Sequence, residues 1–219
     1  MNTPQLVIFD CDGVLVDSEV IACRVDAACL AEIGISITTQ EVMERYVGIS
    51  ATSMFADIET RYGRKLPSDF PDRVRARLAP AFDAELAPIP GIQTALARLS
   101  ARRCVASSSA PERVRHTLGL VGLLPYFEPY IFSAVQVPRG KPAPDLFLFA
   151  SAQMEVPPVE CLVIEDSEAG VKAAVAAGMR VLGFTGGGHC GPGHASRLRE
   201  VGASEVFDDM RNLQDFLIR

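Results

Sequence analysis

The chain has 219 residues, of which 48% are hydrophobic and 22% charged, as expected for a globular protein with one sizeable core or a core and a smaller domain. The formal net charge of −6 and the lack of a long basic run argue against nucleic acid as the main partner. We expect no membrane span, because no apolar stretch approaches ~20 residues, and no signal peptide. The six cysteines are irregularly spaced without a Cys-x-x-Cys pair, which favours a reduced, cytoplasmic protein.

After an apolar strand at 6–9, the first 90 residues are helical in pattern. Apolar residues recur at helical spacing in 18–33 and 73–86. A further helix is predicted to begin at Thr38. Thr38 and Glu41 form a predicted capping box. No convincing strand lies within 17–87, and a proline cluster at 88–91 closes this helical block.

From residue 92 onward, predicted helices and strands alternate. The helices are 92–102, one with Pro111 in its first turn, 144–153, one ending at Gly178, and a terminal helix; the strands are 104–106, 130–132, 161–164, 181–184 and 205–207. Such alternation implies a parallel sheet with helices on both faces. We therefore predict an α/β fold: a Rossmann-like, doubly wound parallel-sheet core of residues 1–16 and 89–219, with an inserted all-helical cap at 17–88.

Polar side chains follow three of these strands at the carboxyl edge of the sheet, where doubly wound proteins bind ligands. The residues expected there, with a lysine from a nearby loop, are Asp10, Asp12, Ser107, Ser108, Lys141, Glu165 and Asp166. In extended backbone, residues i and i+2 project to the same side, so Asp10 and Asp12 face one site while Cys11 points away.

Converging carboxylates repel one another unless a cation lies among them, and hard oxygen ligands suit Mg²⁺. A metal held by Asp10 and Asp166 could also hold a phosphate oxygen. Lys141 would neutralise phosphate charge, and Ser107 with Ser108 would supply hydrogen bonds. We therefore assign Asp10 as a nucleophile that forms an aspartyl-phosphate and Asp12 as the general acid and base.

Each residue also has a purely structural explanation. Ser107 could cap a helix, Lys141 could be a solvated loop lysine, and Glu165–Ser167 could cap the following helix. Asp17 and Ser18 are better explained as the start of the first cap helix than as catalytic residues. Separate structural explanations account poorly for the common order and the shared placement at strand ends.

The sequence resembles the haloacid dehalogenase superfamily, in the branch whose helical cap follows the first motif. The matching motifs are Phe9–Glu19 (FDCDGVLVDSE), Ser107, Lys141 within GKPAPD, and Glu165–Gly170 (EDSEAG). The resemblance implies Mg²⁺ bound by Asp10, Asp166 and the backbone carbonyl of Asp12, with Glu165 in support. It also implies a cap that opens and closes over the substrate.

Within this branch, the resemblance favours a phosphatase that acts on a sugar phosphate or sugar-acid phosphate. Dehalogenases lack the second aspartate, which is Asp12 here. The alternative is a phosphosugar mutase of the β-phosphoglucomutase type, but the histidine and arginine expected of a mutase correspond to Ala22 and Ala51. The spacing from Asp17 to Gly48 resembles bacterial 6-phosphogluconate phosphatases. A phospho-accepting signalling receiver or an inactive binding domain is the alternative of another class; the 70-residue insertion argues against a receiver.

The cap offers few indications of the substrate. Candidates for contacts to the leaving group are Arg24, Arg45, Tyr46, Gly48, Ser50 and Thr52, although a solvated helix face is the better explanation of each one taken alone. The glycine-rich loop 186–194 contains two histidines and a cysteine, which suggests a soft-metal site, but we expect a mobile surface loop instead. We expect a small phosphorylated substrate, and a monomer, with a dimer as the alternative.

Overall fold

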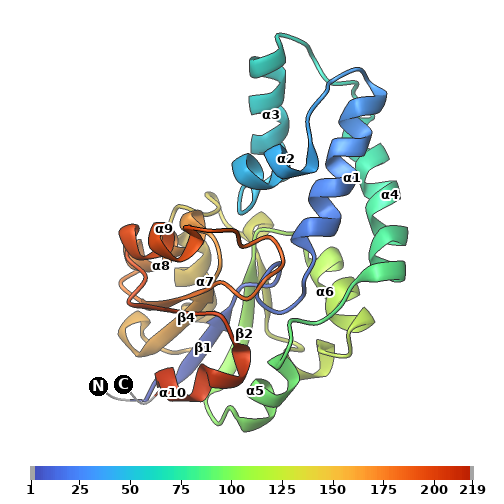
Figure 1. Ribbon diagram of the computed structural model, residues 1–219. Helices are drawn as coiled ribbons and strands as arrows, with labels where there is room; N and C mark the ends of the chain where they lie inside the picture. Colours follow the sequence, from blue (N-terminus) through green and yellow to red (C-terminus); the bar gives the residue numbers. More distant parts are fainter. Residues whose placement is uncertain (1–2, 218–219) are drawn as a thin grey trace.

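A computed structural model describes residues 3–217 as a six-stranded parallel sheet flanked by helices, with four further helices set apart at one end (Figure 1). The strands are β1 (Leu6–Phe9), β2 (Arg102–Ser107), β3 (Ile131–Ser133), β4 (Cys161–Glu165), β5 (Arg180–Phe184) and β6 (Glu205–Phe207). Their order in the sheet is β3-β2-β1-β4-β5-β6, and every neighbouring pair is parallel. The predicted doubly wound α/β class is confirmed.

The helices divide between the core and the inserted region. The inserted helices are α1 (Glu19–Glu32), α2 (Thr39–Tyr46), α3 (Ala51–Tyr62) and α4 (Phe70–Glu85). The core helices are α5 (Ile92–Arg98), α6 (Pro111–Leu120), α7 (Asp145–Gln153), α8 (Glu168–Ala176), α9 (His194–Glu200) and α10 (Leu213–Leu217), with short 3-10 turns at Leu124–Tyr126, Ala134–Gln136, Pro158–Glu160 and Met210–Asn212.

The two faces of the sheet are buried by different helices. On one face, Val7 and Phe9 of β1 belong to a cluster with residues of α5, α6 and α10. On the other face, Leu6 and Ile8 pack with residues of α7, α8 and α9. All four β1 side chains are fully buried, which explains why this strand is an uninterrupted apolar run rather than an alternating one.

Strand β1 lies at the centre of the sheet although the next 70 residues of the sequence leave it. Phe9 pairs with Val105 of β2 on one side and with Ile164 of β4 on the other. The strand order reverses at this place, so the crevice at the carboxyl end of β1 is the ligand position expected for such sheets. The residues that follow β1 therefore enter the middle of that crevice.

Helices α1–α4, which we call the cap, have a hydrophobic cluster of their own that includes Leu30, Ile58 and Phe70. In Figure 1 they stand beyond the carboxyl edge of the sheet. The two connecting segments pair with each other: Asp17 N–H donates to Ala87 O at 2.9 Å, and Ile89 N–H donates to Leu15 O at 3.0 Å. We propose that residues 17–88 move as one domain on this paired connection.

Local expectations agree with the structure in part: helices α3 and α9 were not expected, and the boundary between α5 and β2 differs. The Thr38–Glu41 capping box is present. The helix expected at 92–102 ends at Arg98, and the strand expected at 104–106 already begins at Arg102. The buried Leu99 is extended, and β2 gains Arg102 and Arg103 because they pair with Leu6 and Val7 of β1. Sheet pairing therefore outweighed the local helical pattern.

No helix within residues 3–217 is both long enough and apolar enough to cross a bilayer.

Because the cap has a separate core, we expect Ile58→Ala, at a fully buried cap position, to cost ~2–5 kcal/mol locally. Amide hydrogen exchange should rise in 19–85 and stay unchanged in the sheet. Val159→Ala is the matched control, because Val159 lies in the α/β domain and is 81% exposed. Its free energy of unfolding should change by less than ~0.5 kcal/mol. Equal acceleration of exchange in cap and sheet would contradict independent cap stability.

Candidate active site

Acidic side chains gather at the carboxyl edge of the sheet, as the sequence predicts. Asp10 directly follows β1, and its N–H donates to Ile164 O at 3.0 Å, which holds it beside the end of β4. Glu165 ends β4 and is followed by Asp166. Carboxylate oxygens of these three residues lie within 4.8 Å of one another, and all three side chains are buried. The sheet therefore concentrates negative charge at the centre of its crevice.

The turn after β1 determines how closely the first motif approaches this cluster. Cys11 O accepts hydrogen bonds from the N–H groups of Leu15 and Val16, and the Cys11 side chain is buried in the core, away from the site as predicted. Gly13 has φ +80°, and a Cβ there would lie 1.9 Å from Asp166 Oδ2. Only glycine fits this turn, because both the backbone conformation and the space exclude a side chain.

Lys141 supplies the positive charge that this cluster needs. Its ammonium donates to Asp10 Oδ1 at 2.7 Å, to Glu165 Oε1 at 2.6 Å and to the carbonyl of Ala106 at 3.0 Å. The side chain is 2% exposed, so it is not a solvated loop lysine. Burial alone would lower the pKa of Lys141, but Asp10 and Glu165 outweigh it and raise the pKa above its usual value.

Glu165 is fixed on its other oxygen by the motif that follows it. Oε2 accepts hydrogen bonds from the N–H and the hydroxyl of Ser167, each at 2.9 Å. A Cβ on Gly170 would lie 1.8 Å from Oε1, so the glycine leaves room for the carboxylate. Ser167 also caps α8 through Gly170 N–H, as the structural explanation of this motif expects.

Asp10 remains strained electrostatically despite Lys141. Burial raises its pKa well above the usual value, Lys141 opposes this effect, and Glu165 and Asp166 add to it. Three buried carboxylates form an oxygen-only donor set, which suits a hard divalent cation, so the residues present fit Mg²⁺.

Asp12 lies in a different environment, between the core and the start of the cap. Its Oδ1 accepts from Ser18 Oγ at 2.6 Å and from Arg113 at 3.1 Å, and its Oδ2 accepts from Ser109 Oγ at 2.7 Å. Burial raises the pKa of Asp12, but Arg113 and the two hydroxyls outweigh it, so the net pKa is lowered. The carboxyl pair after β1 is thus divided into one group with a raised pKa and one with a lowered pKa.

Three contacts of Asp12 and its neighbours were not predicted. Ser109 is the third serine of the run that contains Ser107, and no local pattern distinguishes it from the other two. Arg113 lies in the first turn of α6, where no motif marks it. Ser18 was expected only to start a helix, but its hydroxyl makes no capping bond and contacts Asp12 instead. Long-range folding, not local spacing, brings these donors together.

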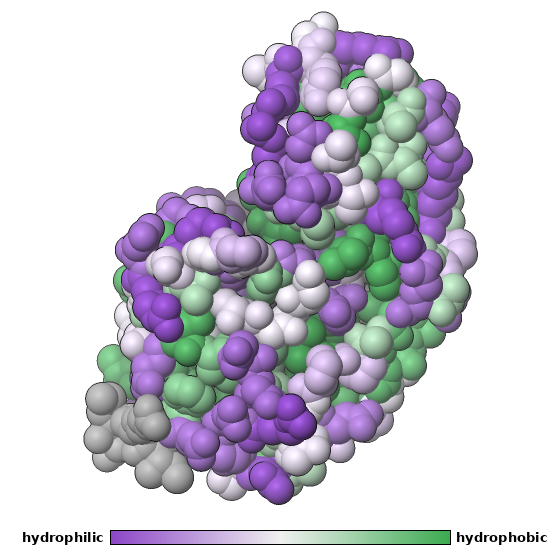
Figure 2. All heavy atoms as spheres, viewed as in Figure 1, coloured by the Kyte–Doolittle hydropathy of each residue, from purple (hydrophilic) through white to green (hydrophobic). Residues whose placement is uncertain are grey.

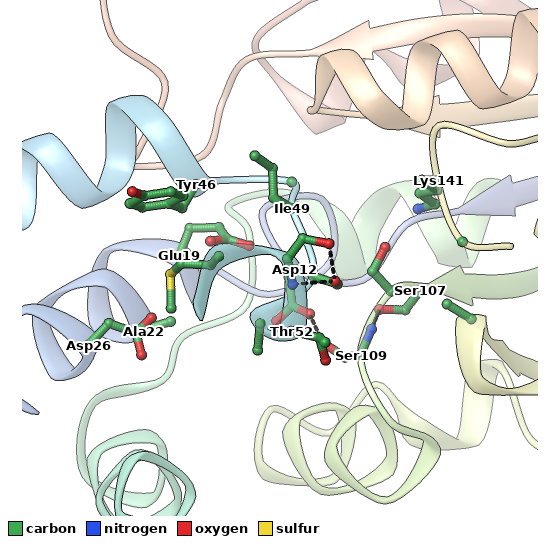
Figure 3. A pocket seen from close by; sticks show the side chains of 18 of the residues that line it. Asp12, Glu19, Ala22, Asp26, Tyr46, Ile49, Thr52, Ser107, Ser109 and Lys141 are labelled. Carbon is green, nitrogen blue, oxygen red and sulfur yellow. Dashed lines mark hydrogen bonds between the residues drawn. The ribbon is translucent and has the colours of Figure 1, made fainter. Parts of the chain in front are cut away.

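A cavity of about 1080 Å³ lies between the cap and the core, where the space-filling view is indented (Figure 2). The core contributes Ser107, Ser108 and Lys141 to its lining. Figure 3 shows Glu19, Ala22 and Asp26 of α1 on one side of Asp12, with Ser107 and Lys141 on the other. Predicted phosphate contacts and cap residues thus face one space.

The structure separates the predicted cap residues. Those that line the cavity are Tyr46, Gly48, Ser50 and Thr52. Gly48 approaches the core closely, since a Cβ there would lie 2.5 Å from Ser167 Cβ. Arg45 lines a neighbouring pocket. Arg24 is not brought to the site; its guanidinium pairs with Glu85 at 2.6 Å, with about half of each side chain exposed. Glu19 and Asp26 line the cavity but were not predicted.

The glycine-rich loop 186–194 is not the surface loop that we expected. The His189 side chain is 1% exposed, and its Nε2 lies 3.0 Å from Asp166 Oδ2. His194 is also buried, with Nε2 at 2.6 Å from the carbonyl of Asp166. Gly188 N–H donates to Asp17 Oδ1 at 3.0 Å. The loop therefore packs against the acidic cluster, a long-range contact that its glycine content concealed.

Comparison with known proteins agrees with this site. Residues 7–184 match the family model described as haloacid dehalogenase-like hydrolase. The chain is 34% identical to the 6-phosphogluconate phosphatase of Escherichia coli K12, over 95% of this chain and 99% of that protein. It is 31% identical to the β-phosphoglucomutase of Bacillus subtilis 168, with 82% of each covered.

The structure is also similar to the crystal structure of a conserved haloacid dehalogenase-like protein from Agrobacterium tumefaciens. The TM-score is 0.86 at 41% identity, with 97% of each chain covered. Fold, sequence and acidic cluster lead to the same conclusion: the chain belongs to the haloacid dehalogenase-like hydrolase family.

Proposed function

We propose that this protein is a Mg²⁺-dependent phosphatase that hydrolyses a small polyhydroxylated phosphate ester through an aspartyl-phosphate on Asp10. The observation that carries the proposal is the buried group of Asp10, Glu165 and Asp166 around Lys141. Three buried carboxylates face one ammonium, so the group has an excess of negative charge that a divalent cation would neutralise.

The proposed chemistry divides the work between the two aspartates of the first motif. Mg²⁺, held by Asp10, Asp166 and the backbone carbonyl of Asp12 with Glu165 in support, would neutralise phosphate charge when bound. Asp10 attacks phosphorus, and Lys141 keeps its carboxylate oriented through Oδ1. The alkoxide takes a proton from Asp12, which later removes a proton from the water that hydrolyses the acyl phosphate.

The surroundings of Asp12 support its role in the second step. Its lowered pKa keeps it ionised, which is the form of a general base. To act first as an acid it must gain a proton, and this requires weaker contacts with Ser18, Ser109 and Arg113. Ser18 adjoins the connection to the cap, so cap movement would alter one of these contacts.

Hydrolysis is favoured over mutase chemistry by the α1 wall of the cavity. Ala22 lines this wall where a mutase would be expected to place a histidine, and it lies beside Asp26 in Figure 3. Ala51, at the second mutase position, also lines the cavity. Neither side chain can bind the second phosphate of a bisphosphate, so release to water is the simpler outcome.

The charge of the cap wall favours an uncharged polyol over a sugar acid as leaving group. The cavity lining from the cap includes Glu19 and Asp26, the cation of Arg75, and Glu59, which is paired with Lys65 at 2.6 Å; Arg113 lines the cavity from the core. Burial raises the pKa of Glu19 to about 8 and that of Asp26 to about 6. A mainly protonated Glu19 can donate to and accept from hydroxyl groups, while an ionised Asp26 repels a carboxylate.

Asp10→Asn should lower kcat by about a thousandfold or more, because an amide cannot form the acyl phosphate. Asp12→Ala should slow both the departure of the alkoxide and the hydrolysis of the acyl phosphate, more than it weakens metal binding, and any phosphoryl group on Asp10 is detectable as a hydroxylamine-labile label. Asp208→Asn, at an exposed position, is the control. Near-normal turnover in Asp10→Asn would exclude this mechanism, and long-lived label without turnover in the unaltered protein would indicate a signalling receiver.

A substrate panel tests the leaving group. With Mg²⁺ present, kcat/KM for hexitol and hexose 6-phosphates should exceed that for 6-phosphogluconate by about tenfold, a difference of ~1.4 kcal/mol. Asp26→Asn should narrow this ratio, and chelator should stop all phosphate release. A preference for 6-phosphogluconate would contradict the polyol proposal. Formation of glucose 6-phosphate from β-glucose 1-phosphate without free phosphate would indicate a mutase.

Asp26 also predicts a pH dependence of stability in the ligand-free protein. Its pKa of about 6 exceeds the usual 3.8, so the unfolded chain loses its proton first and stability falls as pH rises from about 4 to 6. Asp26→Asn should remove this decline and raise the free energy of unfolding at pH 7 by ~1–2 kcal/mol. Urea titrations at several pH values measure the free energy of unfolding, with Asp208→Asn as the control. If Asp26→Asn leaves the pH dependence of this free energy unchanged, Asp26 is not its cause.

A further inference from the structure

The loop 186–194 brings two imidazoles and a thiol together beside the acidic cluster. Ligand atoms of His189, Cys190 and His194 lie within 4.8 Å of one another. We propose that these three side chains, with Asp166 Oδ2 as a fourth ligand, bind a borderline-soft divalent transition metal such as Zn²⁺. This site is distinct in ligand chemistry from the oxygen-only group of Asp10, Glu165 and Asp166, because nitrogen and sulfur ligands select such metals over Mg²⁺.

The distances already approach those of a tetrahedral site. Cys190 Sγ lies 3.3 Å from His189 Nε2, and Asp166 Oδ2 lies 3.0 Å from the same nitrogen. With zinc bonds of about 2.0 Å to nitrogen and 2.3 Å to sulfur, tetrahedral ligand atoms are about 3.5 Å apart. Small movements of these side chains would therefore suffice to admit a metal.

His194 is oriented in the way that metal-bound histidines usually are. Its Nε2 lies 2.6 Å from the carbonyl of Asp166, so this nitrogen carries the proton and donates it. A ligating histidine typically donates its other ring N–H to such a carbonyl. The Nδ1 lone pair now accepts from Arg197 at 3.1 Å. Arg197 is about half exposed and also lies near Glu168, so it can release Nδ1 to a metal.

The surroundings of His189 are built to hold its ring in place. A Cβ on Gly13 would lie 2.7 Å from Cε1 of this ring, and a Cβ on Gly187 would lie 2.8 Å from it. With the ring held in this position, His189 Nε2 lies 3.0 Å from Asp166 Oδ2 and 3.3 Å from Cys190 Sγ. Nε2 is therefore the ring nitrogen that a metal shared with these two side chains would bind.

An ion pair between His189 and Asp166 would not explain why a cysteine stands at position 190. Five of the six cysteines are buried and pack as small apolar residues, whereas Cys190 is partly exposed. Packing therefore gives no reason for a cysteine at this position, and metal binding does. On binding, the Cys190 S–H bond breaks, the thiolate becomes the ligand and the proton passes to solvent.

Asp166 would then belong to both sites, and this consequence rests on the proposed function. A metal on His189, Cys190 and His194 engages Asp166 Oδ2, which the phosphatase needs for Mg²⁺. We therefore expect Zn²⁺ to inhibit phosphate release by withdrawing that ligand.

Cobalt titration of the full chain tests binding without reference to activity. One equivalent of Co²⁺ should give a near-ultraviolet thiolate-to-cobalt band and the intense visible bands of a tetrahedral site. Cys190→Ser and Cys190→Ala should each lose the thiolate band, and His194→Gln should weaken binding at least tenfold. His116→Gln and Cys161→Ser, at positions outside this group, are the matched controls and should bind as the unaltered protein does.

Asp10→Asn separates this site from the Mg²⁺ site, since it should keep the cobalt spectrum while losing turnover. Absence of the thiolate band in the unaltered protein, its persistence in both Cys190 variants, or its loss in Asp10→Asn would overturn the proposal. In the activity assay, Zn²⁺ should inhibit Cys190→Ser less than the unaltered protein, so the ratio of the rate with Zn²⁺ to the rate without it should rise toward one. If the unaltered protein shows the cobalt spectrum but has no phosphatase activity, the proposed function is refuted and the metal site is not.

Discussion

The mutual repulsion of Asp10, Glu165 and Asp166 is the constraint on which the rest of the site depends. Three carboxylates converge because parallel strands β1 and β4 end side by side at the centre of the sheet. Lys141 offsets part of the repulsion with three hydrogen bonds from one buried ammonium. The remainder leaves Asp10 with a raised pKa. A divalent cation would relieve this repulsion.

The glycines of the site follow from the same crowding. Gly13 and Gly170 each stand where a Cβ would lie less than 2 Å from a carboxylate oxygen. They permit the close approach of backbone to charged side chains that a metal and a phosphate both need. Gly48 does the same between cap and core, where it meets Ser167. The cap and the helix that follows the fourth motif are therefore in contact over the catalytic edge.

The two aspartates of the first motif illustrate how one short segment can contain two different chemistries. They are two residues apart, yet Asp10 faces carboxylates and a lysine, whereas Asp12 faces hydroxyls and an arginine. Their pKa values move in opposite directions for this reason. A nucleophile must be ionised, so Asp10 would depend on a bound cation to lower its pKa, whereas Asp12 must gain a proton before it can act as an acid.

The sequence by itself determined the fold class, the capped architecture and the site at the ends of β1, β2 and β4, because strand and helix periodicity and motif order are local properties of the chain. It also indicated Lys141 and the Glu165–Gly170 segment. The tertiary structure alone decided that Ser18, Ser109 and Arg113 surround Asp12 and that loop 186–194 packs on Asp166. Those contacts join segments up to about 170 residues apart in sequence, and no local pattern encodes which distant donor meets a given carboxylate.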